Sequence, residues 1–132
     1  MDVLGSRILL HPLDRATSVH FYRDVLGLAV AREFGPAESP GTVFFLGNGL
    51  LEVSGAGGAD QPAGFAIWVQ VRDVAAEHRR LAELGVSIRR APRTEPWGLI
   101  ECWILDPDGV PIVLVEVPPD HPLRRDLREL TN

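Results

Sequence analysis

An internal repeat is the feature that most constrains the fold of this 132-residue chain. Asp14 precedes a segment that closes with Val25-Leu26-Gly27-Leu28, and Asp73 precedes one that closes with Glu83-Leu84-Gly85-Val86. The spacing from aspartate to glycine differs by a single residue between the two copies. In each copy the aspartate is suited to cap a helix and the glycine to end it. Two copies of one supersecondary structure are therefore predicted.

Strand patterns surround the first predicted helix. The pair Asn48-Gly49 separates two short apolar runs, which is a strong hairpin signal because both residue types tolerate positive φ. The predicted elements of the first copy are a strand over Ser6–His11, a helix over Arg15–Leu26, and strands over Leu28–Phe34, Thr42–Leu46 and Leu50–Ser54.

The second copy follows the same order. Its predicted elements are a strand over Phe65–Val71, a helix over Val74–Leu84, and strands over Val86–Arg89, Trp97–Leu105 and Val110–Val117, with a loop over Arg90–Pro96. We therefore predict an α+β fold of two β-α-β-β-β modules, each with its helix on the convex face of a curved mixed sheet. The modules span residues 1–54 and 65–117, with a linker over 55–64 and a C-terminal tail over 118–132.

Composition excludes several classes of function. The net charge is −5, and no basic stripe is available to neutralise nucleic-acid phosphates. No run approaches the roughly 20 apolar residues that span a bilayer, and no basic-then-apolar leader follows Met1. The single cysteine, Cys102, excludes an intramolecular disulfide and a thiolate zinc cluster. We expect a cytoplasmic protein that binds neither nucleic acid nor membranes.

The tryptophans mark a candidate ligand groove. Side chains alternate along a strand, so Trp68 and Gln70 share one face while Ile67 and Val69 share the other. An aromatic and polar face opposite an apolar one suits a ligand groove, but Trp68 in a second core layer is an open alternative. The candidate ligand-binding residues are Arg7, Leu9, His11, Phe44, Glu52, Trp68, Gln70, Trp97, Trp103 and Val113.

Two motifs carry a family resemblance. The run Phe21–Leu28 resembles the first-helix signature of the glyoxalase, bleomycin-resistance and extradiol dioxygenase superfamily, the vicinal oxygen chelate fold. Asp106-Pro107-Asp108-Gly109 resembles the last hairpin turn of that fold, and the likeness extends from about Ser6 to Val117. The fold hosts metalloenzymes and metal-free binding proteins alike, so the resemblance implies a fold rather than a chemistry.

The metal positions separate those two branches. By the resemblance, the four strand positions that hold His or Glu in the metalloenzymes fall here on Arg7, Glu52, Ala66 and Val113. Only Glu52 could ligate, whereas a catalytic metal needs roughly three protein ligands. A weakly held metal between His11 and Glu52 is the alternative, as is a hydrogen bond from His11 to a loop. We predict no metal and no cofactor.

Other catalytic chemistry has little support in the sequence. Cys102 lies between apolar strand residues and is predicted to be inert packing. Glu101 and Glu52 could form a carboxylate pair across the groove, but a solvated edge is the favoured position for Glu101. No catalytic residue is predicted.

The metal-free branch matches more closely. Ala66–Arg72 and Glu95–Gly98 resemble segments of bleomycin-resistance proteins, where tryptophans line a groove that holds a large, flat, partly cationic antibiotic without chemistry. Trp68 and Trp97 match that pattern, while Gln70 stands in place of a further aromatic residue. Indole faces stack on planar rings and attract cations, and Glu52 could pair a ligand amine.

The resemblance implies a homodimer with each site built between two chains. We therefore predict a metal-free, homodimeric protein that sequesters an aromatic, antibiotic-like natural product. An enzyme of the same fold, a lyase, isomerase or dioxygenase with an atypical site, is one alternative. A binder of some small aromatic metabolite is another.

Overall fold

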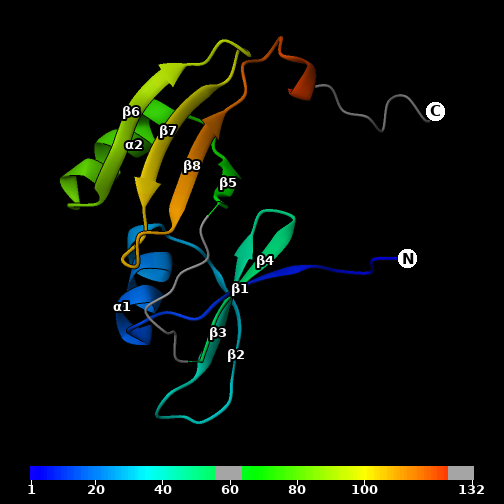
Figure 1. Cartoon of the computed structure of the whole chain (residues 1–132), viewed down its shortest axis with the longest axis vertical. Helices are drawn as coiled ribbons and strands as arrows, with labels where there is room; N and C mark the ends of the chain where they lie inside the picture. The colour runs from blue at the N-terminus through cyan, green and yellow to red at the C-terminus, as the bar shows by residue number, and fades with distance from the viewer. Residues whose placement is uncertain (56–63, 125–132) are drawn as a thin grey trace. The chain divides into compact units, whose positions relative to one another are not determined.

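The computed structural model describes residues 1–55 and 64–124, so most of the predicted linker over 55–64 and the end of the tail over 118–132 lie outside the described residues. The chain divides into two compact units. The first unit contains residues 1–65 and 106–110, and the second contains residues 66–105 and 111–132. Each contains a four-stranded mixed sheet and a helix, which confirms the predicted α+β fold of two β-α-β-β-β modules (Figure 1).

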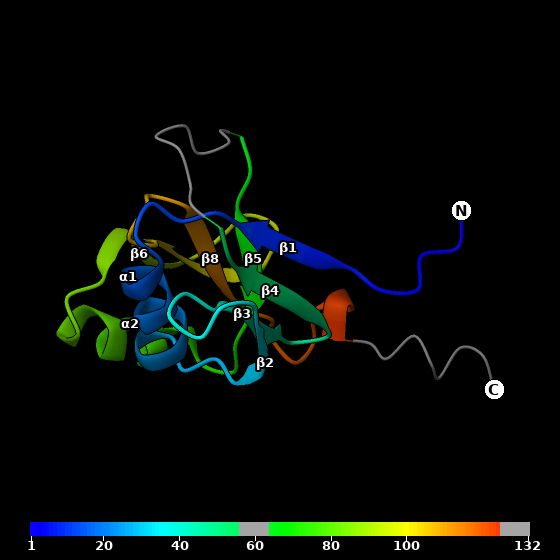
Figure 2. The same cartoon turned by 90° about the horizontal axis from the view of Figure 1, so that it is seen from below.

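The first unit is built from β1 (Arg7–Leu10), α1 (Arg15–His20), the π-helical turn η1 (Phe21–Val25), β2 (Val30–Phe34), β3 (Gly41–Leu46) and β4 (Gly49–Val53). The strand order is β1-β4-β3-β2, with β1 parallel to β4 and the other pairs antiparallel. The helix lies on one side of this sheet in both views (Figure 1, Figure 2).

Both ends of this helix differ in detail from the prediction. The side chain of Asp14 accepts no backbone N–H; instead the Thr17 hydroxyl donates to it. Asp14 therefore stands at the predicted N-cap position, but its carboxylate bonds a hydroxyl one turn away instead of a backbone N–H. At the other end, Leu26 N–H donates to the carbonyl of Phe21, a wider turn than in an α-helix, and Gly27 follows with a φ of 77°.

The core of the first unit lies where the helix meets the sheet. Tyr22 packs edge-on against Phe21 and contacts Phe44, with ring centroids 5.1 and 6.2 Å apart. The Tyr22 hydroxyl donates to Asp106 over 2.8 Å, and Asp106 also accepts the backbone N–H of Val110. Burial raises the pKa of both the Tyr22 phenol and the Asp106 carboxyl. This contact packs the turn at residues 106–110 into the first unit.

The second unit contains β5 (Ile67–Gln70), α2 (Val74–Glu83), β6 (Ser87–Thr94), β7 (Ile100–Leu105), β8 (Pro111–Glu116) and the short 3₁₀ turn η2 (Pro122–Arg124). Its strand order is β5-β8-β7-β6, with β5 parallel to β8. Asp73 caps α2 as predicted, because its carboxylate accepts the N–H of Ala76 over 3.0 Å. No helix in the described ranges is long and apolar enough to cross a membrane.

Strand β6 differs most from the sequence-based expectation. The predicted strand ended at Arg89, but β6 continues to Thr94 and includes Pro92. Proline is tolerated there because β6 is an edge strand and its register is irregular between Arg90 and Arg93. The extension moves both arginines from the predicted loop onto the sheet.

Candidate ligand-binding site

The second unit carries a sheet face lined by aromatic and charged residues. The strand register places Trp68, Val113, Trp103 and Arg90 in one row across the four strands. A second row runs beside it and contains Gln70, Val115, Glu101 and Arg93. We call the surface formed by these two rows and the adjoining Trp97 the tryptophan face.

The floor of the tryptophan face is apolar. Val113 and Val115 are buried in a cluster with Leu99 and Val117, and Trp103 packs against that cluster. Val113, a predicted ligand contact, therefore supports Trp103 rather than facing solvent. The other residues of β8 that alternate with these valines, Ile112 and Leu114, form the core on the opposite side of the sheet.

Two tryptophans are exposed at the face. The exposed fractions are 49% for Trp68 and 58% for Trp97. Indoles are large and apolar, and exposed clusters of such residues commonly mark binding surfaces. The alternative that placed Trp68 in a second core layer does not fit this exposure within the chain.

A tight turn presents Trp97. Glu95 and Gly98 close the turn, since Gly98 N–H donates to the Glu95 carbonyl over 2.9 Å. Pro96 occupies the second position, where its fixed φ suits a turn, and Gly98 adopts a φ of 91°. The ring of His121 lies 2.9 Å from the Trp97 carbonyl through Nε2. The turn and the His121 contact together fix the backbone around Trp97.

Glu101 links two of the three indoles. Its Oε2 accepts the Nε1–H of Trp97 over 2.8 Å, and its Oε1 accepts that of Trp103 over 3.4 Å. Glu101 is only 6% exposed, so the predicted solvated edge is wrong. Because the carboxylate occupies both indole N–H groups, the two rings can offer a ligand their faces but not their donors.

Arginines of β6 neutralise the buried carboxylates. Glu95 is 3% exposed and accepts hydrogen bonds from Arg90 and from Arg93 Nε, the latter over 3.1 Å. Arg90 Nη2 also lies 3.8 Å from Glu101 Oε1. Burial of an unpaired carboxylate is costly, so these guanidinium groups make the arrangement possible. Neither Glu95 nor Arg90 was predicted as a site residue; the available signal was the presence of two arginines and a glutamate in the predicted loop.

Candidate residues of the first unit form a separate polar cluster. Arg7 Nη1 donates to Glu52 Oε1 over 2.8 Å, and the Ser54 hydroxyl donates to Glu52 Oε2 over 2.7 Å. The hydrogen bonds from Ser54 and Arg7 lower the pKa of the Glu52 carboxyl. His11 Nδ1 lies 2.9 Å from the Ser54 carbonyl, and Leu9 is exposed on the same face. An arginine thus already neutralises the glutamate.

The described part of the chain does not bring together side chains that could ligate a metal. No group of three His, Cys, Asp or Glu side chains in residues 1–55 and 64–124 is placed to hold an ion. His11 bonds to a loop carbonyl, and Glu52 is taken by Arg7 and Ser54. Cys102 is fully buried, and burial raises the pKa of its thiol, which disfavours the nucleophilic thiolate.

Phe44 does not line the predicted groove. It is fully buried against Tyr22, on the side of the sheet that faces the helix. Its neighbour Phe45 is exposed on the face that carries Arg7 and Glu52, because Phe45 pairs with Leu50 and Leu50 pairs with Arg7. Because side chains alternate along a strand, the neighbours Phe44 and Phe45 point to opposite faces of the sheet.

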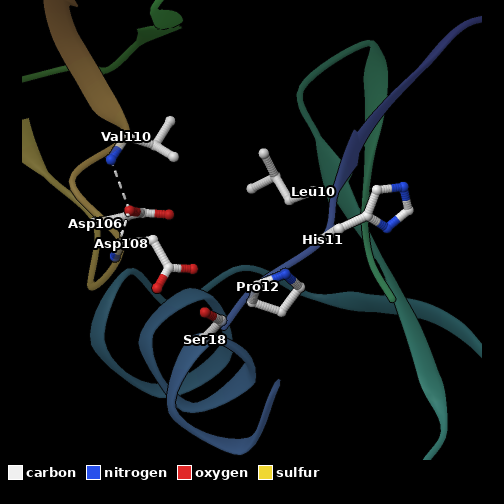
Figure 3. Close-up of a pocket in the computed structure, with 7 residues that line it drawn as sticks. All are labelled: Leu10, His11, Pro12, Ser18, Asp106, Asp108 and Val110. Carbon is white, nitrogen blue, oxygen red and sulfur yellow. Dashed lines mark hydrogen bonds between the residues drawn. The ribbon is translucent and has the colours of Figure 1, made fainter. Parts of the chain in front are cut away.

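One internal pocket of the first unit is too small to hold a ligand. It has no room for a water molecule, and it is lined by Leu10, His11, Pro12, Ser18, Asp106, Asp108 and Val110. Figure 3 shows the His11 ring directed away from Asp106 and Asp108, so these groups do not converge on a common centre. Ser18 Oγ is buried there without a partner among the described residues.

The two β-α-β-β-β units place the chain among small α+β proteins built from two modules. The family described as the Glyoxalase/Bleomycin resistance protein/Dioxygenase superfamily matches residues 8–114. The chain therefore belongs to this superfamily. No curated protein sequence matches the chain.

Solved structures share the fold at low identity. A superfamily member from Sphaerobacter thermophilus DSM 20745 has 21% identity and a TM-score of 0.72, covering 87% of this chain and 98% of its own. TioX from Micromonospora sp. ML1 has 20% identity and a TM-score of 0.73, covering 86% and 98%. TnmS3, an antibiotic binding protein from Streptomyces sp. CB03234, has 19% identity and a TM-score of 0.73, covering 89% and 98%.

Proposed function

We propose that this protein binds and sequesters an aromatic natural product of the antibiotic class, without a metal and without changing the ligand chemically. The observation that carries the proposal is the pair of indoles, Trp97 and Trp103, held by the buried carboxylate of Glu101. A rigid aromatic surface of this kind suits stacking against a planar ligand. The similarity to TnmS3, an antibiotic binding protein, supports the ligand class.

The energetics of such a surface favour planar ligands. Stacked aromatic pairs contribute about 0.5–1.5 kcal/mol beyond the apolar area that they bury. Trp97 and Trp103 lose little freedom on binding because their N–H groups are already bonded, and a preorganised surface reduces the entropy cost of association. Trp68 lies in the same row as Trp103, on the edge strand β5, and adds a third indole.

We further propose that the protein acts as a cytoplasmic homodimer. Exposed large apolar side chains occur in both units, Leu9 and Phe45 in the first and Trp68 and Trp97 in the second. Apolar surface of this kind is unfavourable in water and is commonly covered by a partner or a ligand. A second copy of the chain supplies matching surfaces, and the ligand would then bind between two chains.

The test begins with a thermal-shift screen of intercalating and glycopeptide antibiotics, with and without divalent metals. A ligand that binds the native state raises the melting temperature by mass action. For a ligand found in this way, Trp68→Ala should weaken affinity by on the order of 1–3 kcal/mol, as loss of an aromatic anchor commonly does.

Leu84→Ala is the matched control for that experiment. Leu84 is also an exposed large apolar residue, but it lies at the end of α2. Calorimetry should give an unchanged affinity for this variant. Undiminished affinity in both Trp68→Ala and Trp97→Ala would show that the tryptophan face is not the binding surface. Stabilisation that depends strictly on a divalent metal would favour a metalloenzyme of the same fold.

A further inference from the structure

A hollow of about 290 Å³ lies at the β6 edge of the tryptophan face, lined by Arg89, Arg90 and Trp103. Trp103 and Arg90 are register partners on adjacent strands. Neighbouring strands lie about 4.8 Å apart, so a ring stacked on Trp103 would bring its substituent beside the guanidinium group. The row of residues that contains Trp103 therefore ends, at this hollow, in the positively charged side chain of Arg90.

Positive charge is in excess around this hollow. Three guanidinium groups, those of Arg89, Arg90 and Arg93, stand against the carboxylates of Glu95 and Glu101. Both carboxylates are buried and already paired, so they have little capacity to attract a ligand cation. The chain as a whole has a net charge of −5, so a local excess of positive charge differs in sign from the rest of the protein. Such an excess favours the binding of an anion.

The arginines also retain hydrogen-bonding capacity. Arg89 is exposed and makes no ion pair within the described residues. Arg90 contacts both glutamates through Nη2, and its side chain is still 34% exposed, although its Nε is buried and has no acceptor in the described part of the chain. A guanidinium carries five N–H donors in a planar fork that suits a carboxylate.

We propose that this hollow binds a carboxylate carried by the aromatic ligand, whose ring stacks on Trp103. The inference rests on the proposed sequestration function and narrows its ligand to acidic aromatic compounds. It replaces the cationic preference expected from Glu52, because Arg7 already neutralises that glutamate. The ligand carboxylate would receive N–H groups from Arg89 and Arg90.

Three flat probes that differ only in one substituent test the charge preference: anthraquinone-2-carboxylate, its carboxamide, and 2-(aminomethyl)anthraquinone. Calorimetry with the full chain should give an affinity for the carboxylate about tenfold or more above that for the carboxamide, as charge-assisted hydrogen bonds predict. Added salt should reduce this ratio, because the hollow is open to solvent.

Arg89→Gln should reduce the ratio of carboxylate to carboxamide affinity several-fold. This variant removes charge without leaving a buried glutamate unpaired, as a change of Arg90 would. Arg79→Gln is the matched control, since Arg79 is an exposed arginine of α2, and it should leave the ratio unchanged.

The outcomes separate this inference from the function on which it rests. Equal affinities for the three probes, or a preference for the ammonium probe, would overturn the carboxylate site while aromatic binding stands. A carboxylate preference that is identical in Arg89→Gln would overturn the assignment to this hollow. Absence of binding by all three probes at millimolar concentration would overturn the aromatic-binding proposal and this inference together.

Discussion

Replacement of Glu101 by glutamine tests the link between the fold and the tryptophan face. The glutamate accepts N–H groups from Trp97 over 2.8 Å and from Trp103 over 3.4 Å. Glutamine keeps the shape but has one carbonyl oxygen and an NH₂ group that only donates. It can satisfy one indole, while its NH₂ group meets the other indole or the guanidinium of Arg90.

The expected cost follows from these contacts. A hydrogen bond to a charged group contributes about 1.5–3 kcal/mol to stability. The longer bond to Trp103 contributes less, and water can replace the carboxylate at Trp97, which is more than half exposed. We expect Glu101→Gln to lower the free energy of unfolding by about 1–2 kcal/mol. With a urea slope of about 2 kcal/mol per molar, the midpoint should fall by roughly 0.5–1 M.

Urea denaturation followed by far-ultraviolet circular dichroism is the appropriate assay, because indole fluorescence changes directly with the hydrogen bond. Glu83→Gln, at the exposed end of α2, is the control and should change stability by less than about 0.5 kcal/mol. A double-mutant cycle with Trp97→Phe should give a coupling energy of about 1 kcal/mol. Additive effects of the two changes would refute the argument that Glu101 fixes the Trp97 indole.

Three further predictions concern stability, metals and assembly. The folded-state pKa of Glu52 is lowered, so its stabilising contribution is present above the usual carboxyl value of 4.5 and is lost as the pH falls through the folded value. Urea curves of Glu52→Gln against the native chain should therefore differ by about 0.5–1 kcal/mol at neutral pH and converge in acid; a constant difference would contradict this pairing. Elemental analysis should find no stoichiometric transition metal in the purified protein, whereas about one ion per chain, removable with loss of binding, would contradict the metal-free account. Light scattering at micromolar concentration should give the mass of a homodimer, and a monomer would count against a site covered by a second copy.

Local signals in the sequence predicted the helices well. The aspartate and glycine at the ends of each repeat act on neighbouring backbone groups, so their positions could be inferred without any tertiary information. Asp73 caps α2 as expected. Asp14 also stands at the N-cap of α1, but its carboxylate accepts the Thr17 hydroxyl rather than a backbone N–H, and this choice of partner depends on rotamers that the spacing does not reveal.

Strand ends and burial were predicted less well, for tertiary reasons. Pro92 indicated a loop, but an edge strand with irregular register accommodates it. Phe44 and Phe45 are both aromatic, so residue type does not indicate which of them is buried. The pairing register of the strand decides it. Glu101 was expected at a solvated edge, since an isolated carboxylate in the interior is unfavourable; only the folded chain shows its indole and arginine partners.

The central claim is that the ligand is held and returned unchanged. Long incubation of excess ligand with the protein, followed by mass analysis, tests it most directly when binding is measured on the same sample by calorimetry. We expect saturable binding, quenching of tryptophan fluorescence by the stacked ligand, and complete recovery of unaltered ligand. A chemically altered product formed over many turnovers per protein chain would contradict sequestration and establish an enzyme.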